Sequence, residues 1–228
     1  MKKLNYLFFI IWLSLIPWNR ALGVVGFGVQ GGQSIFDASS KSSKDGVDLT
    51  TSEFANPFSG GGYLYIDAIP VIDLEAEFSI SFKKYTFDFG NAIGVRGPYD
   101  FGWADFSIYL TAGKKIVGIG IPLLAKAKLF YGGGFNIHTV TPLMSMDLMR
   151  SALGGDLTVD PTNLSEEVLI DFLKDNQVKI SGFHIQSGLQ FKVLMLDTFL
   201  FYRHTFSKDV IPGQDHFGSL NLRMGFGF

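Results

Sequence analysis

Residues 216–228, at the carboxyl end of the chain, read HFGSLNLRMGFGF and alternate between two kinds of side chain. Every second position is apolar, and these positions are Leu220, Leu222, Met224, Phe226 and Phe228. The positions between them hold Ser, Asn, Arg and Gly. Successive side chains of a β-strand point to opposite faces, so the pattern predicts a strand with one apolar face. The other face is polar or tightly packed.

The same alternation recurs along the chain and predicts eight strands in total. We expect them at residues 24–32, 60–68, 72–87, 101–121, 124–138, 180–191, 196–206 and 216–228. Residues 74–83 alternate most clearly, with Leu, Ala, Phe, Ile and Phe between Glu, Glu, Ser, Ser and Lys. Gly113, Lys114 and Lys115 interrupt the fourth segment and indicate either a bulge or a turn. The pattern of residues 196–206 does not assign a facing.

The predicted connections alternate in length. Residues 33–59, 88–100, 139–179 and 207–215 form long polar loops, whereas residues 69–71, 121–123 and 192–197 form short turns. The third long loop carries two helical patterns, at residues 142–153 and 163–174. Long loops at one end and short turns at the other are typical of an even-numbered membrane barrel.

Composition narrows the class of protein. The chain has 228 residues, enough for one domain, and a net charge of −2, so no basic excess points to nucleic acid. It has no Cys, which excludes disulfides, thiolate metal sites and a cysteine nucleophile. We expect no cofactor.

The amino-terminal residues form a signal-peptide pattern. Lys2 and Lys3 precede an apolar run over residues 4–18, and Ala21 and Gly23 supply small residues before a cut at Val24. The alternative is an uncleaved anchor, but the run is short for a span of about 20 residues. We therefore expect a signal peptide at residues 1–23 and one domain at residues 24–228.

Residues 24–228 resemble the small eight-stranded bacterial outer-membrane barrels of the OmpA transmembrane domain, OmpX and OmpW types. The resemblance is architectural and carries no site motif. It implies an all-β, eight-stranded, antiparallel, transmembrane up-and-down barrel in outer-membrane lipid, with periplasmic termini and extracellular long loops. It also implies that the barrel-assembly machinery recognises the closing strand, through Leu220, Leu222, Met224, Phe226 and Phe228. The oligomeric state stays undetermined.

A soluble lipocalin-like barrel is the alternative fold, and it would have an apolar interior with a polar exterior. The polar faces here carry charged side chains beside many Gly, which suit the crowded interior of a narrow barrel. If these faces point inward, the lumen gathers Asp67, Glu75, Glu77, Asp105, Lys126, Lys128 and Arg223. Opposite charges buried together would pair, because an unpaired one is costly. We predict a structural plug; a narrow pore lined by charge is the alternative.

The four histidines are expected near the outer rim, and they are His138, His184, His204 and His216. They could gather a metal or act on lipid, but no hydroxyl partner stands in a motif that favours catalysis. We expect neither catalytic nor metal-binding residues.

The predicted function is a non-enzymatic outer-membrane barrel with a structural or surface-interaction role. One alternative is a channel for hydrophobic compounds, entered through Met144, Met146, Met149 and the apolar stripe at residues 164–173. These segments could instead pack on each other to fold the loop. A lipid-modifying enzyme is the second alternative.

Overall fold

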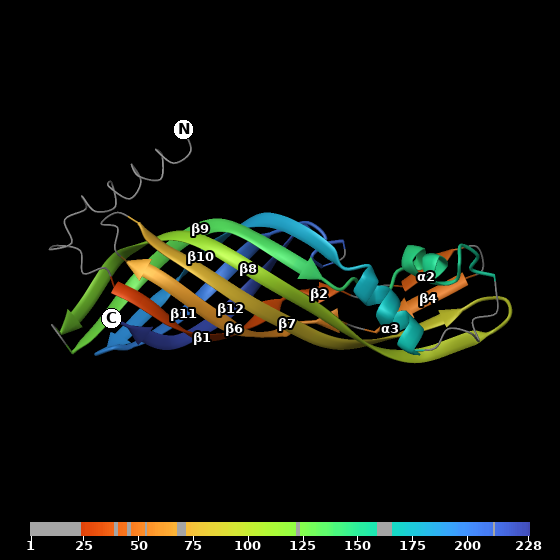
Figure 1. The fold of residues 1–228 in the computed structure, drawn as a ribbon, viewed down its shortest axis with the longest axis horizontal. Helices are drawn as coiled ribbons and strands as arrows, with labels where there is room; N and C mark the ends of the chain where they lie inside the picture. The colour runs from red at the N-terminus through yellow and green to blue at the C-terminus, as the bar shows by residue number, and fades with distance from the viewer. Residues whose placement is uncertain are drawn as a thin grey trace, which may run out of the picture.

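The computed structural model describes residues 24–38, 41–44, 47–52, 54–67, 72–121, 124–158, 166–211 and 213–228. Eight of its strands form a closed antiparallel ring (Figure 1). They are β1 (Val24–Ile35), β6 (Phe58–Asp67), β7 (Asp73–Gly90), β8 (Val95–Ile121), β9 (Ala125–Val140), β10 (Val178–Val193), β11 (Leu196–Phe206) and β12 (His216–Gly227). Each strand of the ring pairs with the ring strands that precede and follow it in the chain, including β7 with β8. The pairing of β1 with β12 closes the ring. The predicted up-and-down barrel of eight strands is confirmed.

The outer face of the barrel is apolar and the inner face is polar. On β12, Leu222 is 46% exposed, whereas its neighbour Arg223 is 1% exposed. On β7, Phe78 is 53% exposed and Glu77 is 4% exposed. This arrangement is that of a transmembrane barrel, since hydrocarbon tolerates apolar side chains and a closed ring leaves no unpaired strand edge. The lipocalin alternative is wrong, because its faces would be reversed.

The interruption in the fourth predicted strand is a bulge and not a turn. β8 runs without a break for 27 residues. Its register against β9 shifts between Lys115 and Val117, which leaves Ile116 as an extra residue. The strand count therefore stays at eight for the ring.

The two ends of the barrel differ in what they carry. The terminal end is where β1 begins and β12 ends, and the loop end is the opposite one. The predicted short turns at residues 69–71 and 121–123 fall largely outside the described residues, as does the predicted signal peptide. The third short turn is described and centres on Leu194 and Met195.

Two connections predicted as loops contain strands. β7 and β8 pair beyond the barrel as far as Gly90 and Val95. β4 (Val47–Thr51) pairs with this extension of β7, and β3 (Lys41–Lys44) pairs with β4. β2 (Asp37–Ala38) and β5 (Phe54–Ala55) form a separate small sheet. The polar composition of these segments hid the strands, whose apolar residues are buried at every second position, as in Val47 and Leu49 of β4.

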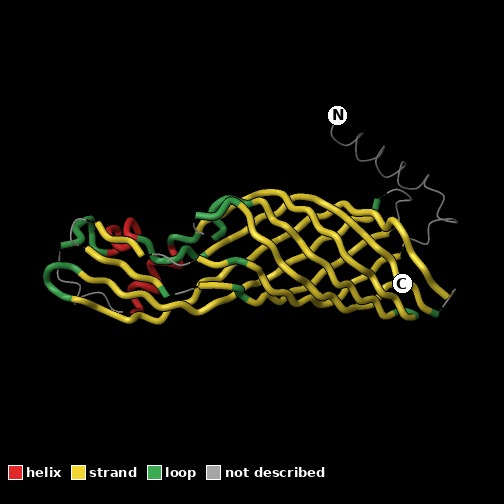
Figure 2. The backbone as a smooth tube through the Cα atoms, turned by 180° about the vertical axis from the view of Figure 1, so that it is seen from behind, coloured by secondary structure: helices red, strands yellow, loops and turns green. Residues whose placement is uncertain are grey.

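We call the part of the structure beyond the loop end of the barrel the extension; it comprises β2 to β5 and the outer parts of β7 and β8. The extension also holds the two helices of the third long loop (Figure 2). These are α2 (Met146–Ala152) and α3 (Glu166–Asp175), close to the predicted segments. The Ser145 side chain caps α2 by accepting a hydrogen bond from the Leu148 backbone N–H. Within the described residues, neither helix is long and apolar enough to cross a bilayer.

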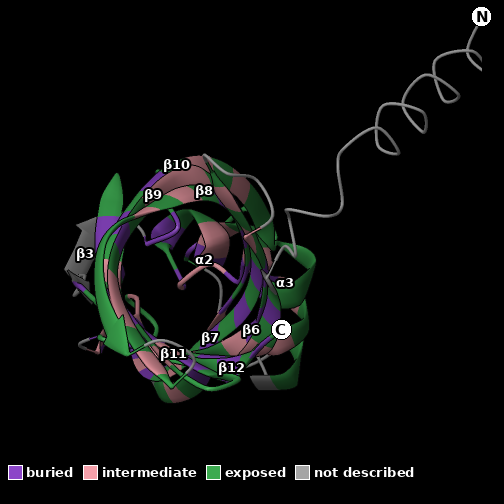
Figure 3. Ribbon diagram, turned by 90° about the vertical axis from the view of Figure 1, so that its left-hand side faces the viewer, coloured by how far each residue is buried: buried purple, intermediate pink, exposed green. Residues whose placement is uncertain are grey.

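An apolar core, which we call the cap, joins the extension to the loop end of the barrel. It includes Phe36, Phe54, Tyr85, Phe87, Phe89, Phe101, Trp103, Met144, Met149, Leu169, Leu173 and Phe217. Viewed along the barrel from the terminal end, α2 lies across the far opening of the ring (Figure 3). Met144 and Met149 are 2% and 0% exposed, so these Met side chains pack inside the cap.

Candidate functional site: the barrel lumen

The centre of the lumen is crossed by a buried ion-pair network. The Arg203 guanidinium on β11 donates to both carboxylate oxygens of Glu77 on β7, with an Nη1–Oε1 distance of 2.7 Å. Arg223 on β12 donates to the same Glu77 carboxylate. β7 and β11 lie on opposite sides of the ring, so the Arg203–Glu77 pair spans its cross-section.

Three further polar side chains complete this network. Arg223 donates to Glu75 Oε2 at 2.9 Å and to Gln30 Oε1 at 3.0 Å. Gln186 accepts from Arg203 Nε at 3.1 Å and donates to Glu75 Oε2 at 3.0 Å. Two guanidinium groups thus meet two carboxylates, and both Arg side chains are at least 98% buried. Buried charges persist only when they are paired and hydrogen-bonded in this way.

Aromatic rings sandwich the two guanidinium groups. The Arg203 guanidinium lies 3.9 Å from the Tyr109 ring centroid. The Arg223 guanidinium lies 4.9 Å from the Tyr63 centroid and 4.6 Å from the Phe201 centroid. Planar guanidinium groups stack on ring faces, and this contact fixes their orientation toward the carboxylates.

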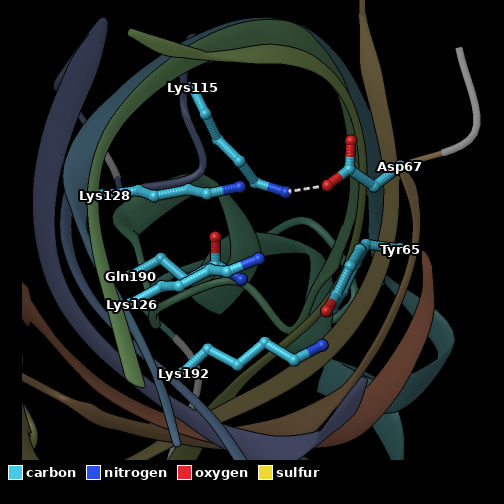
Figure 4. A pocket seen from close by; sticks show the side chains of 7 residues that line it. All are labelled: Tyr65, Asp67, Lys115, Lys126, Lys128, Gln190 and Lys192. Carbon is cyan, nitrogen blue, oxygen red and sulfur yellow. Dashed lines mark hydrogen bonds and ion pairs between the residues drawn. The ribbon is translucent and has the colours of Figure 1, made fainter. Parts of the chain in front are cut away.

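The terminal end of the lumen carries a second polar layer (Figure 4). Lys115 Nζ lies 2.5 Å from Asp67 Oδ2 and 3.4 Å from Asp73 Oδ2. Tyr65 donates a hydrogen bond to the buried carboxylate of Asp197, which also accepts from Gln190 Nε2 at 2.8 Å. Lys126, Lys128 and Lys192 extend into the same space.

The third layer lies between the central network and the cap. His138 Nδ1 lies 2.9 Å from Asp105 Oδ2, and His184 Nε2 lies 2.9 Å from Thr111 Oγ1. The Tyr109 ring meets both imidazole rings edge to face. All three aromatic groups are buried.

The seven charged residues predicted for the lumen occupy these three layers. Glu75, Glu77 and Arg223 contact one another in the central network. Asp67 shares the terminal layer with Lys126 and Lys128, and Asp105 lies in the layer beneath the cap. The sequence predicted pairing among these charges without assigning partners, and Glu75 and Glu77 pair with arginines.

The four histidines were predicted near the outer rim without a facing, and two of them face inward. His138 and His184 are 0% and 1% exposed and face the lumen. His204 and His216 do face outward, with ring centroids 5.0 Å apart, beside Phe206. Strand parity explains why the four differ, because each histidine takes the facing of its own position in its strand.

Sequence reasoning missed Arg203, the cation that spans the ring, because it left the facing of residues 196–206 open. The register of the β10–β11 turn carries the missing signal. Val193 pairs with Leu196, and paired residues share a face, so Leu196 is outward like Val193. Counting by twos from Asp197 then places Arg203 inside.

Chemically, this arrangement places two paired arginines and two glutamates at the centre of the lumen. Glu75 and Glu77 neutralise the two arginines of the central network, and each arginine is held by two or more partners. Within the described residues, no group of three His, Asp or Glu side chains is placed to hold a metal ion. The two interior histidines, His138 and His184, are buried inside the barrel between the central network and the cap.

No protein-family model matches the sequence, and no curated protein matches it. Solved structures that are similar include the attachment invasion locus protein Ail of Yersinia pestis, in complex with the heparin analogue sucrose octasulfate. That comparison gives 12% identity, 90% coverage of this chain, 99% coverage of Ail and a TM-score of 0.44. The N-terminal β-barrel domain of Pseudomonas aeruginosa OprF gives 10% identity, coverages of 90% and 97%, and a TM-score of 0.48. OprG, an outer membrane protein of the same species, gives 12% identity, 90% coverage of this chain, 95% coverage of OprG and a TM-score of 0.47.

Proposed function

We propose that this chain is an integral outer-membrane barrel whose lumen is closed and whose folded extension acts at the cell surface. The single observation that carries the proposal is the Arg203–Glu77 pair across the ring. Because this pair crosses the lumen, we infer that the barrel supports the extension and does not conduct solutes. The extension, with its own strands, helices and apolar core, is then the part that meets other molecules.

The apolar outer wall supports the location in a membrane. Phe27, Leu64 and Ile108 on three different strands are all more than a third exposed, as are their outward neighbours around the ring. In water such a surface would associate or aggregate, whereas in lipid it is the stable arrangement. A closed barrel whose strands span a membrane in this way is the arrangement of outer-membrane proteins.

The proposal includes the route to that membrane. Residues 1–23 act as a signal peptide, and removal before Val24 leaves a mature chain that begins at β1. The outward residues of β12, from Leu220 to Phe228, are recognised by the barrel-assembly machinery. The terminal end then faces the periplasm, and the extension faces the outside of the cell.

The channel alternative is less well supported. A channel for hydrophobic compounds needs an apolar path through the barrel, but the centre of this lumen holds two arginines and two glutamates. Five of the side chains proposed as its entrance are buried in the cap, namely Met144, Met146, Met149, Leu169 and Leu173. We therefore propose a non-conducting role, and we also propose that the protein is not an enzyme.

Ion conductance tests the closed lumen. The purified mature protein in a planar bilayer should show no steady single-channel steps, whereas a double variant Glu77→Ala, Arg203→Ala should conduct. The double variant removes both side chains of the crossing pair and leaves no single buried charge. Stepwise conductance by the unmodified protein at levels equal to the double variant would contradict the proposal.

Surface labelling tests the orientation. An epitope inserted between Ala92 and Ile93, in the turn that joins β7 to β8, should bind antibody on intact cells. A matched epitope inserted between Leu194 and Met195 should bind only after the outer membrane is permeabilised. The opposite result would reverse the proposed orientation.

A further inference from the structure

The lumen at the terminal end carries more lysines than the adjacent carboxylates neutralise. Four lysines line one cavity there, and we call Lys115, Lys126, Lys128 and Lys192 the lysine cluster (Figure 4). Lys126 on β9 pairs directly opposite Lys192 on β10, and Lys128 follows on the same face. Like charges directly opposite each other on antiparallel strands are destabilising. This arrangement therefore favours an anion between them.

The carboxylates near the cluster are already engaged. Asp67 and Asp73 both form ion pairs with Lys115. Asp197 accepts hydrogen bonds from Tyr65 and Gln190, and its distance to Lys192 Nζ is 3.8 Å. Within the described part of the chain, no carboxylate forms an ion pair with Lys126 or Lys128. Two ammonium groups thus face the cavity without an acidic partner.

A buried acceptor borders the same cavity. The bond from Gln190 Nε2 to Asp197 fixes the orientation of the Gln190 amide, so its Oε1 atom is the free end. Gln190 is 4% exposed, and among the described residues Oε1 has no hydrogen-bond partner. Figure 4 shows this oxygen directed into the space between Lys126 and Lys128. A buried acceptor without a donor is costly, so a bound molecule that donates a hydrogen bond would satisfy it.

The size of the cavity limits the occupant. Its volume is about 70 Å³. Because one water needs roughly 10–15 Å³ in this measure, the space suits a few waters or one small oxyanion. The cavity lies inside the barrel and not on its apolar wall, so the occupant must arrive from solution. A lipid head group is therefore not the ligand.

We propose that the lysine cluster binds a soluble oxyanion of the phosphate class, with Lys126 and Lys128 as its main cationic partners. Near neutral pH, phosphate carries both unprotonated oxygens and a P–OH group. The unprotonated oxygens accept charge-assisted hydrogen bonds from the ammonium groups. The P–OH group donates to Gln190 Oε1, which a fully deprotonated anion such as sulfate cannot do. The proposed function places this site at the periplasmic mouth, but binding by the purified barrel does not depend on that location.

Calorimetric titration of the folded mature protein with inorganic phosphate, in a maltoside detergent at pH 7, tests the site. We expect saturable binding of one phosphate for each barrel. The double variant Lys126→Gln, Lys128→Gln should bind phosphate about tenfold more weakly or worse, because two charge-assisted hydrogen bonds are lost. The control Lys84→Gln, Lys114→Gln removes two exposed lysines outside the cavity and should bind like the unmodified protein.

The choice of anion tests the role of Gln190. Phosphate should bind several-fold more tightly than sulfate, and Gln190→Leu should abolish this preference because it removes the acceptor. Heat-dependent gel migration confirms that each variant is folded before its titration. Absence of saturable phosphate binding by the unmodified protein overturns the proposal, as does equal binding by the Lys126→Gln, Lys128→Gln variant. Equal affinity for sulfate and phosphate overturns the assigned role of Gln190.

Discussion

The substitution Glu77→Gln gives the sharpest test of the central network. Glu77 accepts hydrogen bonds from both Arg203 and Arg223, and its side chain is 2% exposed. Gln has nearly the same volume but no charge. Arg223 keeps Glu75 as a partner, whereas Arg203 loses the carboxylate with which it pairs. The change therefore leaves one buried guanidinium without a counter-charge.

The expected loss of unfolding free energy follows from this one unpaired guanidinium. Removing one partner of a buried ion pair costs about 3–5 kcal/mol, chiefly because the remaining charge stays buried. The Gln carbonyl can still accept one hydrogen bond, so we expect a loss near the lower bound, about 3 kcal/mol. Urea unfolding in detergent, followed by the fluorescence of Trp103, measures it. Trp103 is buried in the cap, and it is the single Trp of the chain from Val24 onward.

Two variants serve as controls. Glu75→Gln leaves Arg223 paired with Glu77 and should cost less, about 1–2 kcal/mol. The double variant Glu77→Gln, Arg203→Gln should be more stable than the sum of its single changes predicts, by about 0.5–3 kcal/mol. The account of the network fails if Glu77→Gln costs no more than Glu75→Gln. Strictly additive effects in the double variant would also refute it.

Three further predictions test other parts of the barrel. Gly61→Ala should lower the unfolding free energy by about 1–3 kcal/mol in thermal unfolding, because an added Cβ would lie 2.0 Å from the Phe78 backbone oxygen. The control Gly60→Ala meets no atom within 4 Å and should have little effect. Tyr65→Phe should lower the unfolding free energy by about 1.5–3 kcal/mol through loss of the hydrogen bond to the Asp197 carboxylate, and an unchanged urea midpoint would contradict that bond. Deletion of Phe228 should reduce the amount of folded protein in the outer-membrane fraction without changing total synthesis, and unchanged recovery would argue against its role in assembly.

The barrel could be predicted from sequence because lipid imposes a simple rule on each strand. One face must be apolar along its whole length, so a period of two persists over many residues, as from Leu220 to Phe228. The facing of most strands followed from this period alone. The alternation of long and short connections supplied the strand order, since neighbours in the chain pair in such a ring.

The extension could not be predicted in the same way. Outside the barrel, water can contact either face of a sheet, and short strands such as β4 are embedded in polar sequence. The partners of Val47 and Leu49 come from distant segments, and no local pattern specifies them. The apolar residues of the third loop did indicate burial, as Met149 shows, but not the surface against which they pack.

The lumen was predictable in composition but not in pairing. Sequence reasoning placed Glu75, Glu77 and Arg223 inside, but it could not show that Arg203 reaches across the ring. Which carboxylate meets which cation depends on strand tilt and register across the barrel, and these are set by the whole ring. The lysines therefore remained available for a different role at the terminal end.

The most direct measurement is the migration of the protein on a semi-native detergent gel, boiled and unboiled, from fractionated Gram-negative cells that express it. A closed barrel with an apolar outer wall and a paired, buried interior resists detergent until it is heated. We predict a band in the outer-membrane fraction that shifts on boiling. A periplasmic band with no shift would contradict the account, because the exposed apolar face would then have no lipid to cover it.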